Sequence, residues 1–147
     1  MNNMLKKSIA ALLSVLALCA SHIQASEIEA IENVIKQSEA AVNSAAPDKW
    51  AEIMYSDKVI VVGEGAPASI RGLDALMSTI KGVTSSVKRC SINVNDARVT
   101  DQISWAFATW MCQPTEGEPF SVRALYVLEK EQSGWKVTAE MYTMGEM

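Results

Sequence analysis

Histidine is almost absent from this chain of 147 residues, and the one histidine, His22, lies in a segment with the features of a secretory signal peptide. Two lysines come first, an apolar run follows, and small residues lead up to Ala25. The apolar run, about 13 residues, is shorter than the roughly 20 that a membrane-spanning helix needs. We therefore expect residues 1–25 to be removed. Residues 26–147 are then one domain in the periplasm or outside the cell, with no membrane attachment.

Without His22, the mature chain lacks a group on which several kinds of active site depend. Ser-His and Cys-His nucleophiles use imidazole as their base, and imidazole is the commonest protein ligand of metals such as zinc. Removing the leader's two lysines from 13 basic residues leaves 11 against 17 acidic residues, a net charge of −6. Such a surface disfavours nucleic acid. We therefore expect no metal site, no cofactor and no nucleic-acid partner.

Only two cysteines follow residue 25, Cys90 and Cys112, and an even number in an oxidising compartment favours a disulfide. They lie at almost equal distances on either side of a predicted turn at Asp101, so they oppose each other if the two strands pair without a bulge. The apolar alternation changes phase near Asn95 and Asp96, which predicts a bulge. A bulge would place the two sulfur atoms on opposite faces, so both outcomes stay open.

Apolar residues recur at helical spacing in the first half of the mature chain and alternate in the second half. Pro47 suits the first turn of a helix, and turn residues separate the alternating segments. Helices followed by a meandering antiparallel sheet predict an α+β domain whose helices cover one sheet face. The predicted helices are residues 26–42, 47–56 and 71–82, and the predicted strands are 58–62, 87–99, 103–112, 120–129 and 135–143.

Three short segments add a more specific indication. DKWAEIMYSDKVIVV places an aromatic residue between a short helix and a strand, Pro67–Gly72 opens the third helix, and SGWKV forms the turn before the last strand. In this order and spacing the chain resembles the nuclear transport factor 2-like superfamily, in particular its SnoaL-like and ketosteroid isomerase-like branch. The resemblance implies a cystatin-like roll, in which a curved antiparallel sheet wraps around N-terminal helices to form a cone with an apolar cavity. It also implies a homodimer formed through the outer sheet face.

Alternation along the last three strands indicates which side chains face the inside of the cone. Arg123, Glu140 and Tyr142 have the opposite phase, so we expect them to face outward. The inward set is mainly apolar, which is typical both of a filled core and of a pocket for a small apolar molecule. The residues expected to line such a pocket are Trp105, Phe107, Thr109, Met111, Val122, Ala124, Ala139 and Met141.

The resemblance also allows a test for catalysis. Ketosteroid isomerases use a carboxylate base on the first strand, a tyrosine from the first helix and a protonated acid on a later strand. In this chain the three positions correspond to Gly63, Ser38 and Tyr126. The base is missing, although Glu64 stands one residue away and is the candidate catalytic carboxylate, with Tyr126 as a hydrogen-bond donor. A carboxylate between two glycines in a loop is, by default, solvated.

These observations support three hypotheses. The first is an exported SnoaL-like domain that binds a small apolar molecule in a conical pocket. The second is an enzyme of the isomerase, dehydratase or cyclase type that uses Glu64 and Tyr126. The third is a dimeric interaction module with a filled interior and no ligand, which an outward-facing Trp110 would favour.

Overall fold

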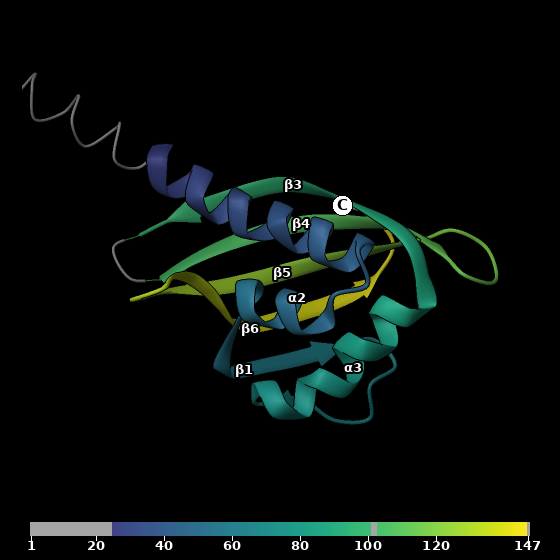
Figure 1. The fold of residues 1–147 in the computed structure, drawn as a ribbon. Helices are drawn as coiled ribbons and strands as arrows, with labels where there is room; N and C mark the ends of the chain where they lie inside the picture. Colours follow the sequence, from purple (N-terminus) through teal and green to yellow (C-terminus); the bar gives the residue numbers. More distant parts are fainter. Residues whose placement is uncertain (1–24, 101–102, 147) are drawn as a thin grey trace, which may run out of the picture.

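The computed structural model describes residues 25–100 and 103–146 (Figure 1). The predicted signal peptide, with His22, lies outside the described residues except for Ala25. No helix within the described ranges combines the length and the apolar character needed to cross a membrane.

A curved six-stranded sheet forms one layer of the molecule, and its strands follow the order β2-β1-β6-β5-β4-β3. The last four strands in the chain pair antiparallel with their neighbours, as predicted, but β1 pairs parallel with β6, so the sheet is mixed. The short strand β2 was not predicted. The strands are β1 (Tyr55–Gly63), β2 (Ile70–Arg71), β3 (Val87–Val99), β4 (Ile103–Pro114), β5 (Phe120–Glu131) and β6 (Gly134–Met144).

Three helices lie on the same side of this sheet (Figure 1). The N-terminal helix, residues 25–43, runs along β3 and β4 and buries Ile31 and Ile35 at the four-residue spacing of an amphipathic helix. Helix α2 (Pro47–Met54) begins with proline and buries Trp50 and Met54. Helix α3 (Leu73–Ser86) continues to Ser86, past the end expected at residue 82. The predicted α+β class is confirmed.

The inward face of β4 was predicted in the wrong phase. Ala106 and Ala108 are fully buried against the helices and Trp110 is 7% exposed, whereas Trp105 and Phe107 lie on the opposite face, where their rings contact edge to face. Both phases of this strand are apolar, so hydrophobicity alone does not choose between them. Small alanines inside leave room for the helix layer, and the larger rings cover the outer face. Trp110 therefore faces inward, against the interaction-module hypothesis.

Cys90 and Cys112 form a disulfide across β3 and β4. The predicted bulge is present, because the pairing shifts by one residue between Val94 and Asp96. It was wrong to expect that this bulge would separate the sulfur atoms. Val99 pairs with Ser104, so the connection is one residue longer than expected, and the bulge cancels that extra residue and brings the cysteines opposite each other.

Side chains of the N-terminal helix bond to the free edge of β3. Asn43 accepts a hydrogen bond from the Cys90 backbone N–H at 2.7 Å and donates one to the Cys90 carbonyl at 2.8 Å. Glu39 accepts from the Ile92 N–H at 2.8 Å, and the Lys36 ammonium donates to the Ile92 carbonyl. An edge strand with unpaired backbone groups is a template for aggregation. The helix therefore both satisfies and shields this edge.

We expect Asn43→Ala to lower the free energy of unfolding by about 1–3 kcal/mol, because two backbone groups of β3 lose their partner. Asn33→Ala, on an exposed position of the same helix, is the matched control and should change stability by less than about 0.5 kcal/mol. Urea denaturation followed by circular dichroism measures both. Equal effects of the two substitutions would show that the edge contact contributes nothing.

Candidate functional site

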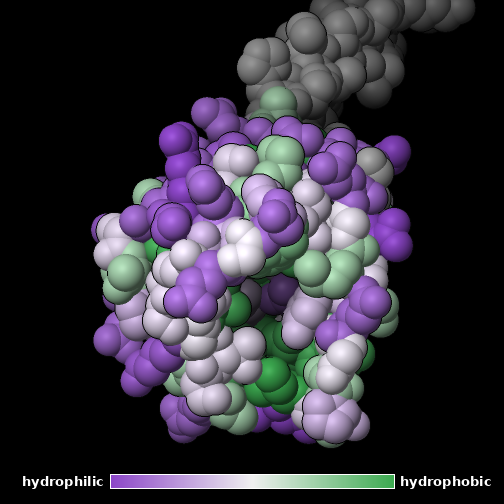
Figure 2. Space-filling model, turned by 90° about the vertical axis from the view of Figure 1, so that its right-hand side faces the viewer, coloured by the Kyte–Doolittle hydropathy of each residue, from purple (hydrophilic) through white to green (hydrophobic). Residues whose placement is uncertain are grey.

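A pocket of about 260 Å³ lies between α3 and the inner face of the sheet. Figure 2, which faces the right-hand side of Figure 1, shows a hollow in the surface with hydrophobic residues gathered at its lower wall. Every main element except β2, β3 and the N-terminal helix contributes to the lining. The lining residues are Trp50, Tyr55, Val61, Leu76, Thr79, Ile80, Val83, Ser86, Trp110, Cys112, Phe120, Val122, Tyr126, Glu140, Tyr142 and Met144.

A bulge in β6 decides which of its side chains reach this pocket. Val127 pairs with Ala139 but Leu128 pairs with Val137, so Thr138 is an extra residue in β6. A one-residue bulge reverses the side-chain phase beyond it. Trp135 and Val137 face inward before the bulge, and Glu140, Tyr142 and Met144 line the pocket after it. The outward placement predicted for Glu140 and Tyr142 was therefore wrong.

Glu140 is the one ionisable carboxyl in the pocket lining. The Tyr55 hydroxyl donates a hydrogen bond of 2.7 Å to Oε2 of this carboxyl. Burial raises the pKa of Glu140 from its ordinary value of 4.5 to about 7, and the bond from Tyr55 opposes this rise only in part. A carboxyl with this pKa exchanges its proton near neutral pH.

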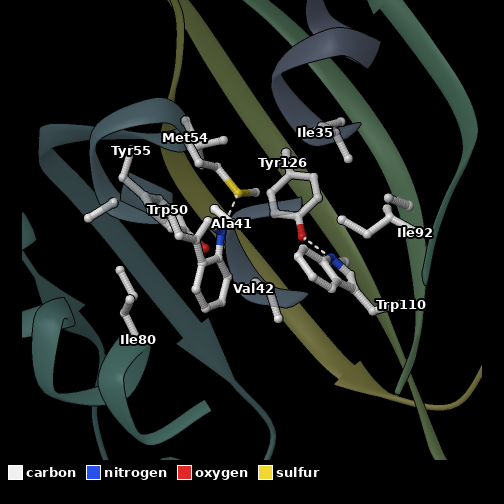
Figure 3. Packing of buried hydrophobic residues seen from close by; sticks show 14 of the residues in the cluster. Ile35, Ala41, Val42, Trp50, Met54, Tyr55, Ile80, Ile92, Trp110 and Tyr126 are labelled. Carbon is white, nitrogen blue, oxygen red and sulfur yellow. Dashed lines mark hydrogen bonds between the residues drawn. The ribbon is translucent and has the colours of Figure 1, made fainter. Parts of the chain in front are cut away.

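Tyr126 lies opposite Glu140 on the neighbouring strand β5. The Trp110 indole N–H donates a hydrogen bond of 2.7 Å to its hydroxyl, shown as a dashed line in Figure 3. Burial raises the pKa of Tyr126 well above 10, so the phenol keeps its proton. Within the described part of the chain no acceptor takes that proton, so it is available to a ligand.

Aromatic rings surround these two polar groups. The ring centroids of Trp50 and Trp110 are 5.7 Å apart and those of Trp50 and Tyr55 are 6.2 Å apart, with the rings tilted rather than stacked. The Trp50 indole N–H donates to the Met54 sulfur at 3.2 Å, and Figure 3 shows this pair beside Tyr55. The rings are therefore held in fixed orientations.

The positions that match the ketosteroid isomerase pattern do not rebuild that site. A Cβ atom at Gly63 would lie 1.9 Å from Cζ of Tyr142, so the tyrosine ring occupies the space where the base would begin. Ser38 is fully buried and donates to the Val34 carbonyl within its own helix at 2.9 Å. Of the three positions, Tyr126 alone lies in the pocket.

Glu64 does not act with Tyr126 in this structure. Its side chain is exposed and lies by a recess on the outer face of the sheet. It accepts hydrogen bonds from the Thr143 hydroxyl and, at 2.7 Å, from the Met144 N–H, and these bonds lower the pKa of the carboxyl. The glycine-flanked loop keeps this carboxylate in solvent, so assigning it as a catalytic base in the pocket was wrong.

The residues predicted to line the pocket divide between the two faces. Val122 lines it, and Ala124 is buried on the same inward phase. Thr109 is buried but bonds to Asn95 at the β3 bulge at 2.9 Å, with no part in the pocket. The prediction was wrong for the remaining five residues, because β4 has the opposite phase and β6 changes phase at its bulge. These residues are Trp105, Phe107, Met111, Ala139 and Met141. Met141 is 60% exposed.

No group of three or more potential metal ligands occurs among the described residues. A larger recess of about 1130 Å³ lies between α2, the start of α3 and the β5–β6 turn, and carboxylates and lysines line it. Its carboxylates are exposed to solvent. The smaller pocket with Glu140 and Tyr126 is therefore the candidate functional site.

Comparison with known proteins identifies the domain. The family model of the SnoaL-like domain matches residues 31–142, which is most of the chain. The chain belongs to the SnoaL-like domain family. No curated protein matches it. The SnoaL-like match contains Glu140 and the three tyrosines of the pocket, Tyr55, Tyr126 and Tyr142.

Solved structures support the same fold. A ketosteroid isomerase-like protein from Erwinia carotovora atroseptica aligns with a TM-score of 0.71 at 18% identity, over 82% of this chain and 98% of that one. A cystatin-like domain of unknown function from Nostoc punctiforme aligns with a TM-score of 0.69 at 18% identity, over 83% of this chain and 79% of that one. An NTF-2 like protein of unknown function from Shewanella oneidensis aligns with a TM-score of 0.70 at 13% identity, over 79% of this chain and 98% of that one. These likenesses confirm the cystatin-like, NTF2-like fold of this SnoaL-like protein.

Proposed function

We propose that this SnoaL-like protein is exported to the periplasm or secreted, and that it binds a small, mainly apolar molecule in the pocket between α3 and the sheet. The observation that carries the proposal is the Tyr126 hydroxyl, which accepts from Trp110 and keeps its own proton for a ligand. The Cys90–Cys112 disulfide supports export, because such bonds persist in oxidising compartments.

The volume of the pocket limits the size of the ligand. A cavity of roughly 150 Å³ in another protein holds benzene, so about 260 Å³ suits one ring or a compact branched group with short substituents. The apolar wall supplies affinity and the Tyr126 hydroxyl orients an acceptor on the ligand.

We expect Tyr126→Phe to weaken binding of single-ring ketones and alcohols by about fivefold to tenfold, because one hydrogen bond to the ligand is lost. Thermal-shift screening of such compounds at graded concentrations identifies ligands, and calorimetry gives the ratio. Asn33→Ala, on the exposed side of the N-terminal helix, is the control and should leave affinity unchanged. If no compound of this size binds, the proposed function is wrong.

Proton transfer is a second candidate function, and Glu140 is the observation that favours it. It replaces Glu64 as the carboxylate opposite Tyr126. Glu140 would take a proton from a carbon beside a ligand carbonyl while Tyr126 donates to the carbonyl oxygen, and would return the proton to another carbon. Exchange of such protons for deuterium, followed by NMR, tests this function: Glu140→Gln should stop the exchange, and an undiminished rate excludes Glu140 as the base.

The outer sheet face supports a homodimer. Val62 and Met141 are 43% and 60% exposed there, next to Phe107 and Leu125. We propose that a second copy of this chain covers that face, since contiguous apolar surface of this kind is typical of an interface.

We expect Met141→Glu to convert the dimer to a monomer, because it places a charge in the apolar centre of the proposed interface. Light scattering after size exclusion measures the mass. Asn33→Glu, on the exposed side of the N-terminal helix, should leave the dimer intact. A wild-type protein that is monomeric at high concentration would contradict the proposal.

A further inference from the structure

The pocket combines many aromatic side chains with a single acidic one. Glu140 is the one carboxyl in its lining, and no lysine or arginine lines it. The residues that α2, α3 and β4 contribute carry no charge, and the groups that face Glu140 from β1, β5 and β6 are the phenols of Tyr55, Tyr126 and Tyr142. Any charge that the pocket carries is therefore negative.

Glu140 has no positively charged partner within the described part of the chain. The ion pairs there are Lys36 with Glu39 at 3.6 Å and Lys130 with Glu27 at 2.6 Å, both away from the pocket. The bond from Tyr55 satisfies one carboxyl oxygen. Glu140 is of intermediate exposure, and a carboxylate that is partly removed from water is ordinarily paired with a cation. The place of the cation is therefore open to a ligand.

The aromatic rings provide the second half of a cation site. The Trp50 ring is tilted by 53° to Tyr55 and by 48° to Trp110, with centroids 6.2 Å and 5.7 Å apart, so it does not stack on either of them. The faces of tryptophan and tyrosine rings attract cations, and walls of such rings are used to recognise alkylated ammonium groups. A single carboxylate beside such rings adds the matching charge.

We propose that the ligand of this pocket is a small organic cation, an alkylated ammonium group with a short polar substituent, held between the aromatic rings and the Glu140 carboxylate. The inference rests on the proposed function, namely that the pocket binds a small molecule. It names the chemical class of that molecule. The Tyr126 hydroxyl then serves the polar substituent, such as a hydroxyl or carbonyl oxygen.

Binding of a cation is coupled to the proton of Glu140. The pKa of about 7 in the empty pocket means that a large part of the carboxyl is protonated at neutral pH. A bound cation favours the charged form, so binding releases the proton. Affinity therefore rises with pH below about 7 and becomes constant above it. A neutral ligand shows no such rise.

Choline and 3,3-dimethyl-1-butanol make a matched pair of probes, because they have the same shape and differ in the charge on the central atom. Calorimetry on the mature protein at pH 6 and pH 8 measures both. We expect choline to bind at least tenfold more tightly than the neutral alcohol at pH 8, and about tenfold more tightly at pH 8 than at pH 6. In Glu140→Gln we expect the preference for choline over the alcohol to fall by about tenfold. We also expect the variant to bind choline equally well at pH 6 and pH 8.

The outcomes separate this inference from the proposed function. If the alcohol binds as well as choline or better, the ligand is not a cation, while binding of small molecules in the pocket stands. If neither probe binds, the inference is wrong, and the screen of single-ring ketones and alcohols decides separately whether the pocket binds a small molecule. A preference for choline that persists unchanged in Glu140→Gln would place the cation away from this carboxylate and overturn the inference.

Discussion

At pH 8 the Glu140→Gln variant is expected to be more stable than the wild type by about 3 kcal/mol, although it removes a charged group. The folded protein raises the pKa of this carboxyl from 4.5 to about 7, which corresponds to about 3 kcal/mol. The folded state holds the proton more tightly than the unfolded chain, so the carboxyl lowers stability as pH rises from about 4.5 to about 7. Above about pH 7 the wild type has lost the full amount of stability, about 3 kcal/mol. Glutamine does not ionise, so the variant keeps that stability.

Urea denaturation at several pH values measures the difference between the two proteins. It should be small near pH 4.5, grow to about 3 kcal/mol by pH 7 and stay constant above. Gln accepts the hydrogen bond from Tyr55 through its amide oxygen, so the comparison isolates ionisation. Glu129→Gln, at an exposed position of β5, is the control and should change stability by less than about 0.5 kcal/mol. A pH-independent difference would mean that the Glu140 carboxyl is solvated.

Replacement of both Cys90 and Cys112 by alanine is expected to lower the free energy of unfolding by about 3 kcal/mol. The bond joins residues 22 apart in sequence, and closing a loop of this length restricts the unfolded chain by about that amount. Both cysteines are buried, at 1% and 6% exposure, so alanine introduces no unsatisfied polar group. Its loss of packing adds a smaller cost.

A reductant separates the two contributions. Dithiothreitol should lower the stability of the wild type by nearly as much as the double substitution, and it should not change the double variant. Cys112 also lines the pocket, so we expect ligand affinity to fall when the disulfide is removed. Equal stability of oxidised and reduced wild type would show that the disulfide does not restrict the unfolded chain.

Alternation and turn residues predicted most of the sheet. The bounds of β3 were predicted as residues 87–99, and the starts of β4 and β5 as residues 103 and 120, in agreement with the structure. Such strands carry their own local signals, namely period-two alternation and polar turns at both ends. The parallel pairing of β1 with β6 has no local signal, because it joins the two ends of the domain.

The central residue of the candidate site was missed for a related reason. Glu140 has outward phase if β6 is counted from Trp135 without interruption, and the bulge at Thr138 reverses that phase. No glycine or proline marks this bulge in the sequence TAEMYT. Tyr126 was found because β5 keeps one phase inward from Phe120 to Leu128. A signal was present, since a lone glutamate between apolar residues on a buried strand is itself unusual.

The positions of the four tryptophans permit the most direct test of the central claim, that small molecules bind in the pocket beside Glu140 and Tyr126. Trp50 and Trp110 line the pocket, whereas Trp105 lies on the outer face and Trp135 bonds to Glu27 at 2.7 Å. The measurement is the shift of the indole N–H signals in ¹H–¹⁵N NMR spectra on addition of a bound ligand. The account predicts that the signals of Trp50 and Trp110 move and the other two stay in place. Movement of the Trp105 signal with Trp50 and Trp110 unchanged would contradict it.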